Sequence, residues 1–321
     1  MIVLDKICKT FPGSRTPAVD QISFQVNQGN ICVFVGPSGC GKTTILRMIN
    51  RLEEPDSGQI SVNNRNIKNL NPDILRRTMG YVIQQIGLLP HKTIEQNVSL
   101  VPELLGWSKS KTAARVLELL SLVGLDPDQV RHKYPHQLSG GQSQRVGVAR
   151  AMAADPPIML MDEPFGAVDP IVRVHLQDEF IRLQQKLKKT ICFVTHDINE
   201  AIKMGDYLIV LNQGRLIQMG TPIEVLTEPA DAFVLDLLGN DRGVKILDLT
   251  RSETLMEPLD QTPENLDPCL VQALEPVKIA LELMMKNNTD QVGVCRNGQL
   301  VGILSWNRIK QYINRVSGEG T

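Results

Sequence analysis

One eight-residue segment, residues 36–43, constrains the fold of this 321-residue chain more than any other. It fits the pattern GxxxxGK[ST], and it lies between an apolar strand predicted at Ile31–Val35 and a helix predicted over 43–50. Glycines let backbone N–H groups close around phosphate oxygens, and the helix N-terminus adds positive dipole character. We therefore predict a phosphate-binding loop that consists of Gly36, Pro37, Ser38, Gly39, Cys40, Gly41, Lys42 and Thr43.

Three side chains at the end of this loop have predicted roles. Lys42 is expected to reach the β- and γ-phosphates as a point charge, and the Thr43 hydroxyl is expected to ligate Mg²⁺. Thr44 either contacts phosphate or is an ordinary helix residue. A glycine-rich turn that matches by chance is the alternative, and the flanking strand and helix argue against it.

A second chemical element is the apolar run Ile-Met-Leu-Met at 158–161, which is followed by Asp162 and Glu163. In open α/β sheets, ligands bind at the carboxyl ends of the strands, where these two acids would emerge. We expect Asp162 to hold Mg²⁺ and Glu163 to polarise the attacking water as a general base. An apolar run before an acidic pair is weak evidence alone, and the phosphate loop strengthens it.

The surrounding pattern predicts an α/β fold. Short apolar strands alternate with helices, which indicates a largely parallel, buried sheet, whereas 22–26 alternates as a half-exposed antiparallel strand does. The net charge is −1 and aromatic residues are 4%, so nothing favours a nucleic-acid partner. No apolar run approaches the ~18 residues that would span a bilayer.

A third element, Leu-Ser-Gly-Gly-Gln at 138–142, starts another helix. Ser139 suits an N-cap, and the two glycines allow close approach to a phosphate. One domain needs only one phosphate cradle. A second cradle makes sense if it completes the site of another copy.

In this order, the three elements resemble the ATP-binding subunit of an ATP-binding-cassette (ABC) transporter, over roughly residues 1–230. The resemblance implies a phosphate-loop NTPase cassette with a mostly parallel core sheet, an antiparallel β subdomain and a helical subdomain. It also implies that two copies of the chain form a homodimer that encloses two ATP molecules. The residues expected to contact the γ-phosphate held by the other copy are Ser139, Gly140, Gly141 and Gln142.

The resemblance assigns further residues. Gln84 is similar to the glutamine that senses Mg²⁺ and the membrane partner, and His196 to the switch histidine that holds the γ-phosphate and the water. Asp169 resembles the residue of the loop joining the two copies, although Val168 replaces the usual Leu. Phe11 resembles the aromatic residue that stacks on adenine, where Tyr is more frequent; a core Phe is the alternative.

The resemblance also implies partners. Separate permease subunits are expected to dock on residues 84–91, with an extracytoplasmic solute-binding protein, which places this chain peripherally on the cytoplasmic face of the cell membrane. The motifs at 49–52, 81–87 and 134–137 are similar to those of importers for glycine betaine, choline, carnitine and other osmoprotectants. The alternatives are an amino-acid or other small-solute importer, an exporter subunit, or a soluble ABC ATPase.

The domains are predicted as a cassette over 1–238, a weakly structured linker over 239–268 and a small α+β unit over 269–321. In the last of these, a helix over 273–286 precedes two apolar runs joined by Asn297 and Gly298, a strong hairpin signal. This unit resembles a single cystathionine-β-synthase (CBS) motif. It is expected either to regulate transport or to serve only as a dimerising tail.

Overall fold

The structure, a computed structural model, describes residues 1–84, 87–166, 168–259 and 269–317. The chain divides into two compact units, Met1–Met219 and Gly220–Thr321. Each unit has a hydrophobic core of its own. Within the parts of the chain that the structure describes, no helix combines the length and the apolar character that a bilayer crossing requires.

A six-stranded sheet forms the centre of the first unit. Its strands, in spatial order, are β10 (Arg215–Gly220), β9 (Tyr207–Asn212), β3 (Ile31–Val35), β8 (Thr190–Val194), β7 (Ile158–Asp162) and β6 (Met79–Val82). Strand β3 pairs in parallel with β8 and β9, and β7 pairs in parallel with β8 and β6. Every residue of β3, β7 and β8 is buried, which explains their continuous apolar sequences and confirms the predicted parallel core.

A second, antiparallel sheet packs onto the same core. Its strands, in spatial order, are β2 (Val19–Val26), β1 (Ile2–Lys9), β4 (Ser57–Val62) and β5 (Arg65–Asn66). Burial alternates along β2, as expected for a strand with one face in the core. The rings of Phe24 and Phe34 join the two sheets in an edge-on contact, with 5.5 Å between centroids.

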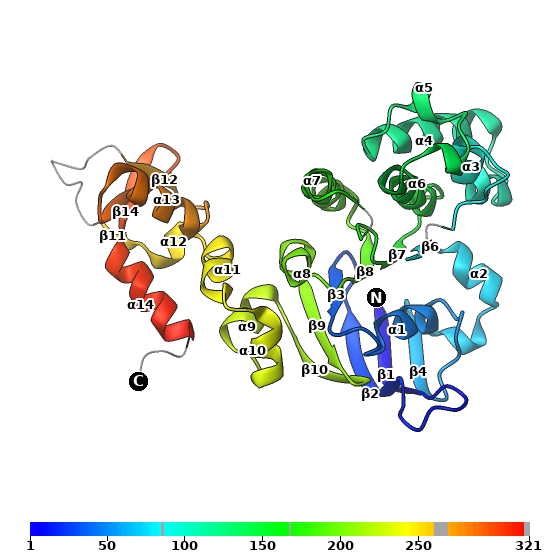
Figure 1. Cartoon of the computed structure of the whole chain (residues 1–321), viewed down its shortest axis with the longest axis horizontal. Coiled ribbons are helices and arrows are strands. Elements are labelled where there is room, and N and C mark those ends of the chain that lie inside the picture. The colour runs from blue at the N-terminus through cyan, green and yellow to red at the C-terminus, as the bar shows by residue number, and fades with distance from the viewer. Residues whose placement is uncertain (85–86, 167, 260–268, 318–321) are drawn as a thin grey trace. The chain divides into compact units, whose positions relative to one another are not determined.

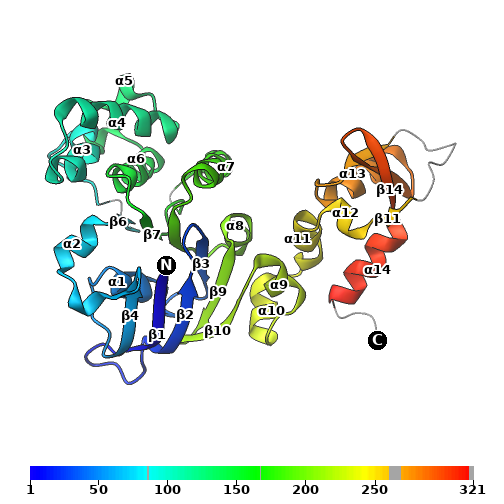
Figure 2. The same ribbon diagram turned by 180° about the vertical axis from the view of Figure 1, so that it is seen from behind.

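Helices complete this unit. They are α1 (Lys42–Ile49), α2 (Pro72–Arg77), α3 (Ile94–Leu104), α4 (Lys109–Leu122), α5 (Pro127–Val130), α6 (Gly140–Met152), α7 (Pro170–Leu187) and α8 (Ile198–Met204), with 3₁₀ turns at Ile67–Asn69 and Pro135–Gln137. Helices α3, α4 and α6 pack against one another. Figure 1 shows α3 to α6 as a group apart from the antiparallel strands, and Figure 2 shows the same group from behind. This group is the predicted helical subdomain.

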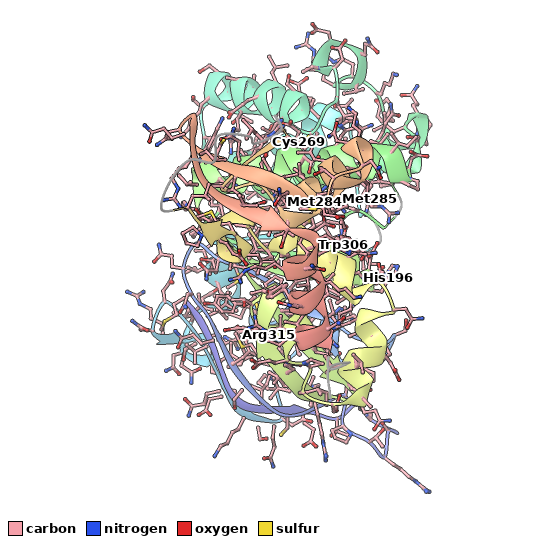
Figure 3. The ribbon with its side chains drawn as sticks, turned by 90° about the vertical axis from the view of Figure 1, so that its left-hand side faces the viewer. His196, Cys269, Met284, Met285, Trp306 and Arg315 are labelled. Carbon is pink, nitrogen blue, oxygen red and sulfur yellow. The ribbon has the colours of Figure 1, made fainter. Side chains whose placement is uncertain are left out.

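The second unit is a small α+β structure. Its elements are α9 (Pro222–Thr227), α10 (Ala232–Leu238), α11 (Arg242–Leu249), α12 (Ser252–Leu255), β11 (Glu257–Pro258), β12 (Leu270–Gln272), α13 (Val277–Asn287), β13 (Gln291–Arg296), β14 (Gln299–Ser305) and α14 (Trp306–Ser317). The sheet order is β11-β14-β13-β12. Asn297 and Gly298 both have positive φ, at 52° and 80°, as a two-residue turn between β13 and β14 requires. Met285 and Trp306 are exposed at the end of α13 and the start of α14 (Figure 3).

Two stretches of this unit differ from the sequence prediction. The segment predicted as a linker holds α11, α12 and β11, because Ile246, Leu247 and Leu255 reach the buried interior; residues 260–268 lie outside the described residues. Helix α13 begins at Val277 and not at 273. Pro276 is its N-cap and disfavours helical geometry for the preceding residue.

Candidate active site

The phosphate loop adopts a backbone that only glycine allows at two positions. Gly36 and Gly41 have φ values of 146° and 104°, which L-residues rarely adopt. A Cβ atom at Gly36 would lie 2.1 Å from the carbonyl oxygen of Leu211, and one at Gly41 would lie 2.4 Å from that of Ala18. The end of β9 and the residue that precedes β2 therefore fix the shape of the loop.

Lys42 belongs to this loop and is the first residue of α1. Its side chain is 7% exposed, and Nζ donates hydrogen bonds to the carbonyl oxygens of Gly36 (2.7 Å) and Pro37 (2.8 Å). Cys40 is buried, whereas Pro37, Ser38 and Gly39 are exposed. The ammonium group is thus held against the backbone of the loop that the sequence predicts to bind phosphates.

Asp162 ends the buried strand β7 and faces the first turn of α1. Thr43 Oγ1 donates a hydrogen bond to Asp162 Oδ1 at 3.1 Å. The carboxyl group is 3% exposed, and burial raises its pKa above the ordinary value, although the hydrogen bond from Thr43 opposes the rise. Because burial disfavours the charged form, a nearby cation would stabilise the Asp162 carboxylate.

Thr43 and Asp162 together fit a Mg²⁺ ion. A hydroxyl and a carboxylate are hard oxygen donors, and Mg²⁺ is commonly held by one or two carboxylates together with substrate phosphates. Across the described ranges, no cluster of three or more His, Cys, Asp and Glu side chains could hold a metal ion by itself. The donor set therefore suits an ion that arrives with a nucleotide.

Glu163 and His196 emerge from neighbouring strands. Glu163 follows β7, and its backbone N–H donates to the carbonyl oxygen of Val194, the last residue of β8. The His196 Nδ1 atom lies 3.3 Å from Glu163 Oε1. The Glu163 side chain is 22% exposed and the His196 side chain 64% exposed, so both are accessible to solvent. Figure 3 labels His196.

The predicted signature turn begins helix α6. Ser139 is its N-cap, and a capping box links it to Gln142: Ser139 Oγ accepts from the Gln142 N–H (3.2 Å), and Gln142 Oε1 accepts from the Ser139 N–H (3.0 Å). Ser139 and Gly140 are exposed. Among the described residues, no hydrogen bond or ion pair joins this turn to the phosphate loop of the same chain.

The remaining predicted residues lie on the surface of the same unit or close to it. Phe11 is part-exposed, with Lys9 Nζ 5.6 Å from its ring centroid, and Gln84 is exposed at the end of β6. Asp169 is exposed at the N-cap of α7, where its carboxylate accepts from the Ile171 N–H at 3.0 Å. Thr44 is part-exposed on α1. Gln85, Ile86 and Ala167, which belong to the predicted permease dock and the joining loop, lie outside the described residues.

Sequence reasoning missed one residue of this site. Gln144 lies on the buried face of α6, and its Nε2 donates to the Glu163 carbonyl oxygen at 2.8 Å. The available signal was a polar residue among the apolar and small residues of the buried face of α6. It was not recognised, because its partner Glu163 lies 19 residues away, after strand β7.

The chain is similar to known transport proteins. A family model described as "ABC transporter" matches residues 19–166. The choline transport ATP-binding protein OpuBA of Bacillus subtilis is 46% identical over 301 residues, which cover 94% of this chain and 77% of that protein. The osmoprotectant import ATP-binding protein OsmV of Salmonella typhimurium is 51% identical over 250 residues, which cover 77% of this chain and 65% of that protein.

A solved structure resembles a large part of the chain. The dimeric post-hydrolysis state of the ATP-binding cassette MJ0796, bound to ADP and Pi, matches with a TM-score of 0.64 and 32% identity. The match covers 69% of this chain and 99% of that one. With the phosphate loop, the acidic strand end and the relatives above, these similarities establish that the chain belongs to the ATP-hydrolysing, ATP-binding subunits of ABC transporters.

Proposed function

We propose that this chain drives the import of a quaternary-amine osmoprotectant of the glycine betaine, choline or carnitine type. The relatives that support this proposal are named as choline, osmoprotectant and glycine betaine/carnitine/choline transport ATP-binding proteins, at 46–51% identity. The second candidate function is the import of an amino acid, which the sequence motifs alone do not exclude. No relative named above favours it.

The observation that carries the proposed chemistry is the meeting of four side chains at one edge of the central sheet. Thr43 bonds to Asp162, and Glu163 lies beside His196. We place the phosphates of ATP on the amides of residues 36–43, with Lys42 as the charge that faces the β- and γ-phosphates. Thr43, Asp162 and, from its predicted role, Gln84 would hold Mg²⁺, which neutralises phosphate charge when bound.

Hydrolysis then depends on Glu163 and His196. Glu163 accepts a proton from the attacking water, and His196 holds the γ-phosphate and that water in line. A general base of this kind contributes about 10²- to 10⁴-fold in rate. The remaining acceleration comes from positioning and from charge stabilisation by Lys42 and the loop amides.

We propose that two copies act together, each completing the ATP site of the other. Ser139, Gly140, Gly141 and Gln142 of one copy would close over the γ-phosphate held by its partner, and Asp169 would lie at the junction. Two findings support this arrangement: Ser139 and Gly140 are exposed at a helix N-terminus, and the matched solved cassette is described as dimeric. Closure would move permease subunits docked at 84–91, on the cytoplasmic face of the membrane.

The test is transport by the complete complex. The chain would be co-purified with its permease subunits, reconstituted in liposomes with its solute-binding protein, and assayed for ATP hydrolysis against glycine betaine, choline, carnitine and a panel of amino acids. We expect stimulation only by the quaternary amines. Stimulation by an amino acid alone would establish the second candidate instead.

We propose that the second unit regulates transport. The alternative is that it serves only to dimerise the chain. Strands β12 to β14 with helices α13 and α14 form one compact helix-and-hairpin structure around Val277, Val292 and Leu304. Truncation after Glu257 tests the role. If dimerisation and the response of transport to salt and nucleotide both stay unchanged, the regulatory role is excluded.

A further inference from the structure

The buried face of α6 carries an amide side chain that reaches out of the helical subdomain. Gln144 is 4% exposed, and its Nε2 donates to the backbone carbonyl oxygen of Glu163 at 2.8 Å. Burying a long polar side chain costs side-chain entropy and desolvation, which only a well-made hydrogen bond offsets. The bond therefore fixes Gln144 and Glu163 with respect to each other.

The Glu163 backbone needs such support. Its φ is 48°, in the left-handed region that residues with a Cβ avoid, and such a conformation persists only where the surroundings determine it. Among the described residues, three hydrogen bonds hold the main chain of Glu163. Its N–H donates to Val194 O (3.0 Å), and its carbonyl oxygen accepts from the Gly166 N–H (3.1 Å) and from Gln144. Of these three bonds, the one from Gln144 comes from a helix, α6.

The direction of the Glu163 side chain follows from this backbone. Rotation about φ and ψ of Glu163 would move the carboxylate away from His196 Nδ1, which now lies 3.3 Å from it. Because the αL conformation is costly for glutamate, loss of one anchor allows the peptide to relax toward ordinary geometry. A carboxylate displaced by ~1 Å can lose about 100-fold in rate.

We infer that Gln144 is a positioning residue for hydrolysis, which holds the backbone of Glu163 so that its carboxylate points at the attacking water. This inference rests on the proposed role of Glu163 as the base. It also gives α6 two functions within one 13-residue helix. The first turn presents the signature to the partner copy, and the second turn anchors the base of its own site.

The experiment uses the full chain in complex with its permease subunits. We compare Gln144→Met, which keeps the length and removes the donor, with Gln184→Met as a matched control. Gln184 is also a buried glutamine, 8% exposed, and its Nε2 donates to Gly29 O at 3.0 Å, beside the amino ends of β3 and β8 and thus at the opposite edge of the sheet. We measure kcat, KM for ATP and the melting temperature of each variant.

For Gln144→Met we expect kcat to fall about 10- to 100-fold with KM for ATP nearly unchanged, and for Gln184→Met we expect kcat to stay within about twofold of the parent. The decisive readout is a double-mutant cycle with Glu163→Gln. If Gln144 acts through Glu163, adding Gln144→Met to Glu163→Gln lowers kcat no further. Should Gln144→Met melt earlier than Gln184→Met, Gln144→Leu replaces it, since it also removes the donor and places no charge in the buried interior.

The outcomes separate the inference from the function on which it rests. An unchanged kcat in both Gln144 variants, or a full additional loss in the Glu163→Gln background, overturns the positioning role while Glu163 stays the base. A Glu163→Gln variant that hydrolyses ATP at the parent rate overturns the proposed base itself.

Discussion

The imidazole of His196 faces the carboxylate of Glu163 across the ends of two adjacent parallel strands, with Nδ1 and Oε1 3.3 Å apart. Glu163 directly follows β7, and His196 lies two residues after the end of β8, so both residues lie just outside the strands. The strands set the distance, and the loops leave both groups accessible. The contact is consistent with the proposal that both groups act on the same attacking water molecule.

Replacing Glu163 by Gln should separate binding from chemistry. The amide fills nearly the same space but cannot accept a proton, so we expect ATP binding to be retained and turnover to fall about 10²- to 10⁴-fold. Equilibrium binding of a labelled ATP together with single-turnover phosphate release measures both. Turnover at the parent rate would exclude Glu163 as the base.

Replacing His196 by Ala should slow hydrolysis without destabilising the fold. The side chain is 64% exposed, so its removal should change the free energy of unfolding by no more than about 0.5 kcal/mol. We expect a loss in kcat of at least about tenfold. His175 lies on α7 outside the site, and His175→Ala is the control that should keep full activity. Equal activity of the two variants would contradict the role of His196.

Replacing Lys42 by Ala should impair nucleotide binding itself. The ammonium group is the predicted charge partner of the β- and γ-phosphates, and no other lysine belongs to the loop. We expect affinity for ATP, measured by isothermal titration calorimetry, to fall at least about tenfold. The exposed Lys68 provides the control variant Lys68→Ala, which should bind ATP as the parent does.

Replacing Asp162 by Asn should change how stability depends on pH. Burial raises the pKa of this carboxyl group in the folded chain. A raised folded-state pKa gives a contribution to stability that is complete below the unfolded-state pKa and is lost as the pH rises through the folded-state pKa. We therefore expect nucleotide-free Asp162→Asn to melt at a higher temperature than the parent at neutral pH, and the difference to shrink in acid.

The same variant should lose a second property. If Asp162 helps to hold Mg²⁺, the rise in melting temperature that Mg²⁺ and ATP together give the parent should be strongly reduced in Asp162→Asn. Thermal denaturation with and without both ligands measures this rise. An undiminished rise would remove Asp162 from the metal site.

Arg242 should be the most sensitive polar residue of the second unit. Its guanidinium donates to the carbonyl oxygens of Leu226 (2.6 Å) and Val316, and so connects the ends of α9 and α14 to α11. Arg242→Met leaves these oxygens without that donor, which we expect to lower the free energy of unfolding by about 1–3 kcal/mol. Arg251→Met, at an exposed position, is the control, and urea titration of both variants decides.

Sequence alone predicted most of the central sheet. Strands β3, β7 and β8 are buried on both faces, so their sequences are continuous apolar runs, and the phosphate loop and the acids follow two of them. The antiparallel strand β2 was predicted from the alternation of apolar and polar residues along it. In each case the signal lies within a few neighbouring residues.

What could not be predicted depends on contacts between distant segments. The bond from Gln144 to Glu163 joins residues 19 apart that lie on different elements, and no local pattern records it. Helix α11 is eight residues long, and α9, α13 and α14 pack against it. Its residues Ile246 and Leu247 are buried by such contacts, which the local sequence does not reveal. Short elements of this kind are stabilised by tertiary contacts more than by their own propensities.

The pairing of Asp162 with Val194 in the β7–β8 register has a consequence for how such a chain can vary. The main-chain ladder sets the spacing between the backbone that follows one strand and the backbone that follows the other. The direction of the Glu163 carboxylate depends in addition on the bond from Gln144. Substitutions that repack the apolar layers therefore leave this spacing intact, provided that the ladder survives. A buried substitution therefore disturbs the geometry of the two groups only where it breaks this ladder or the anchor at Gln144.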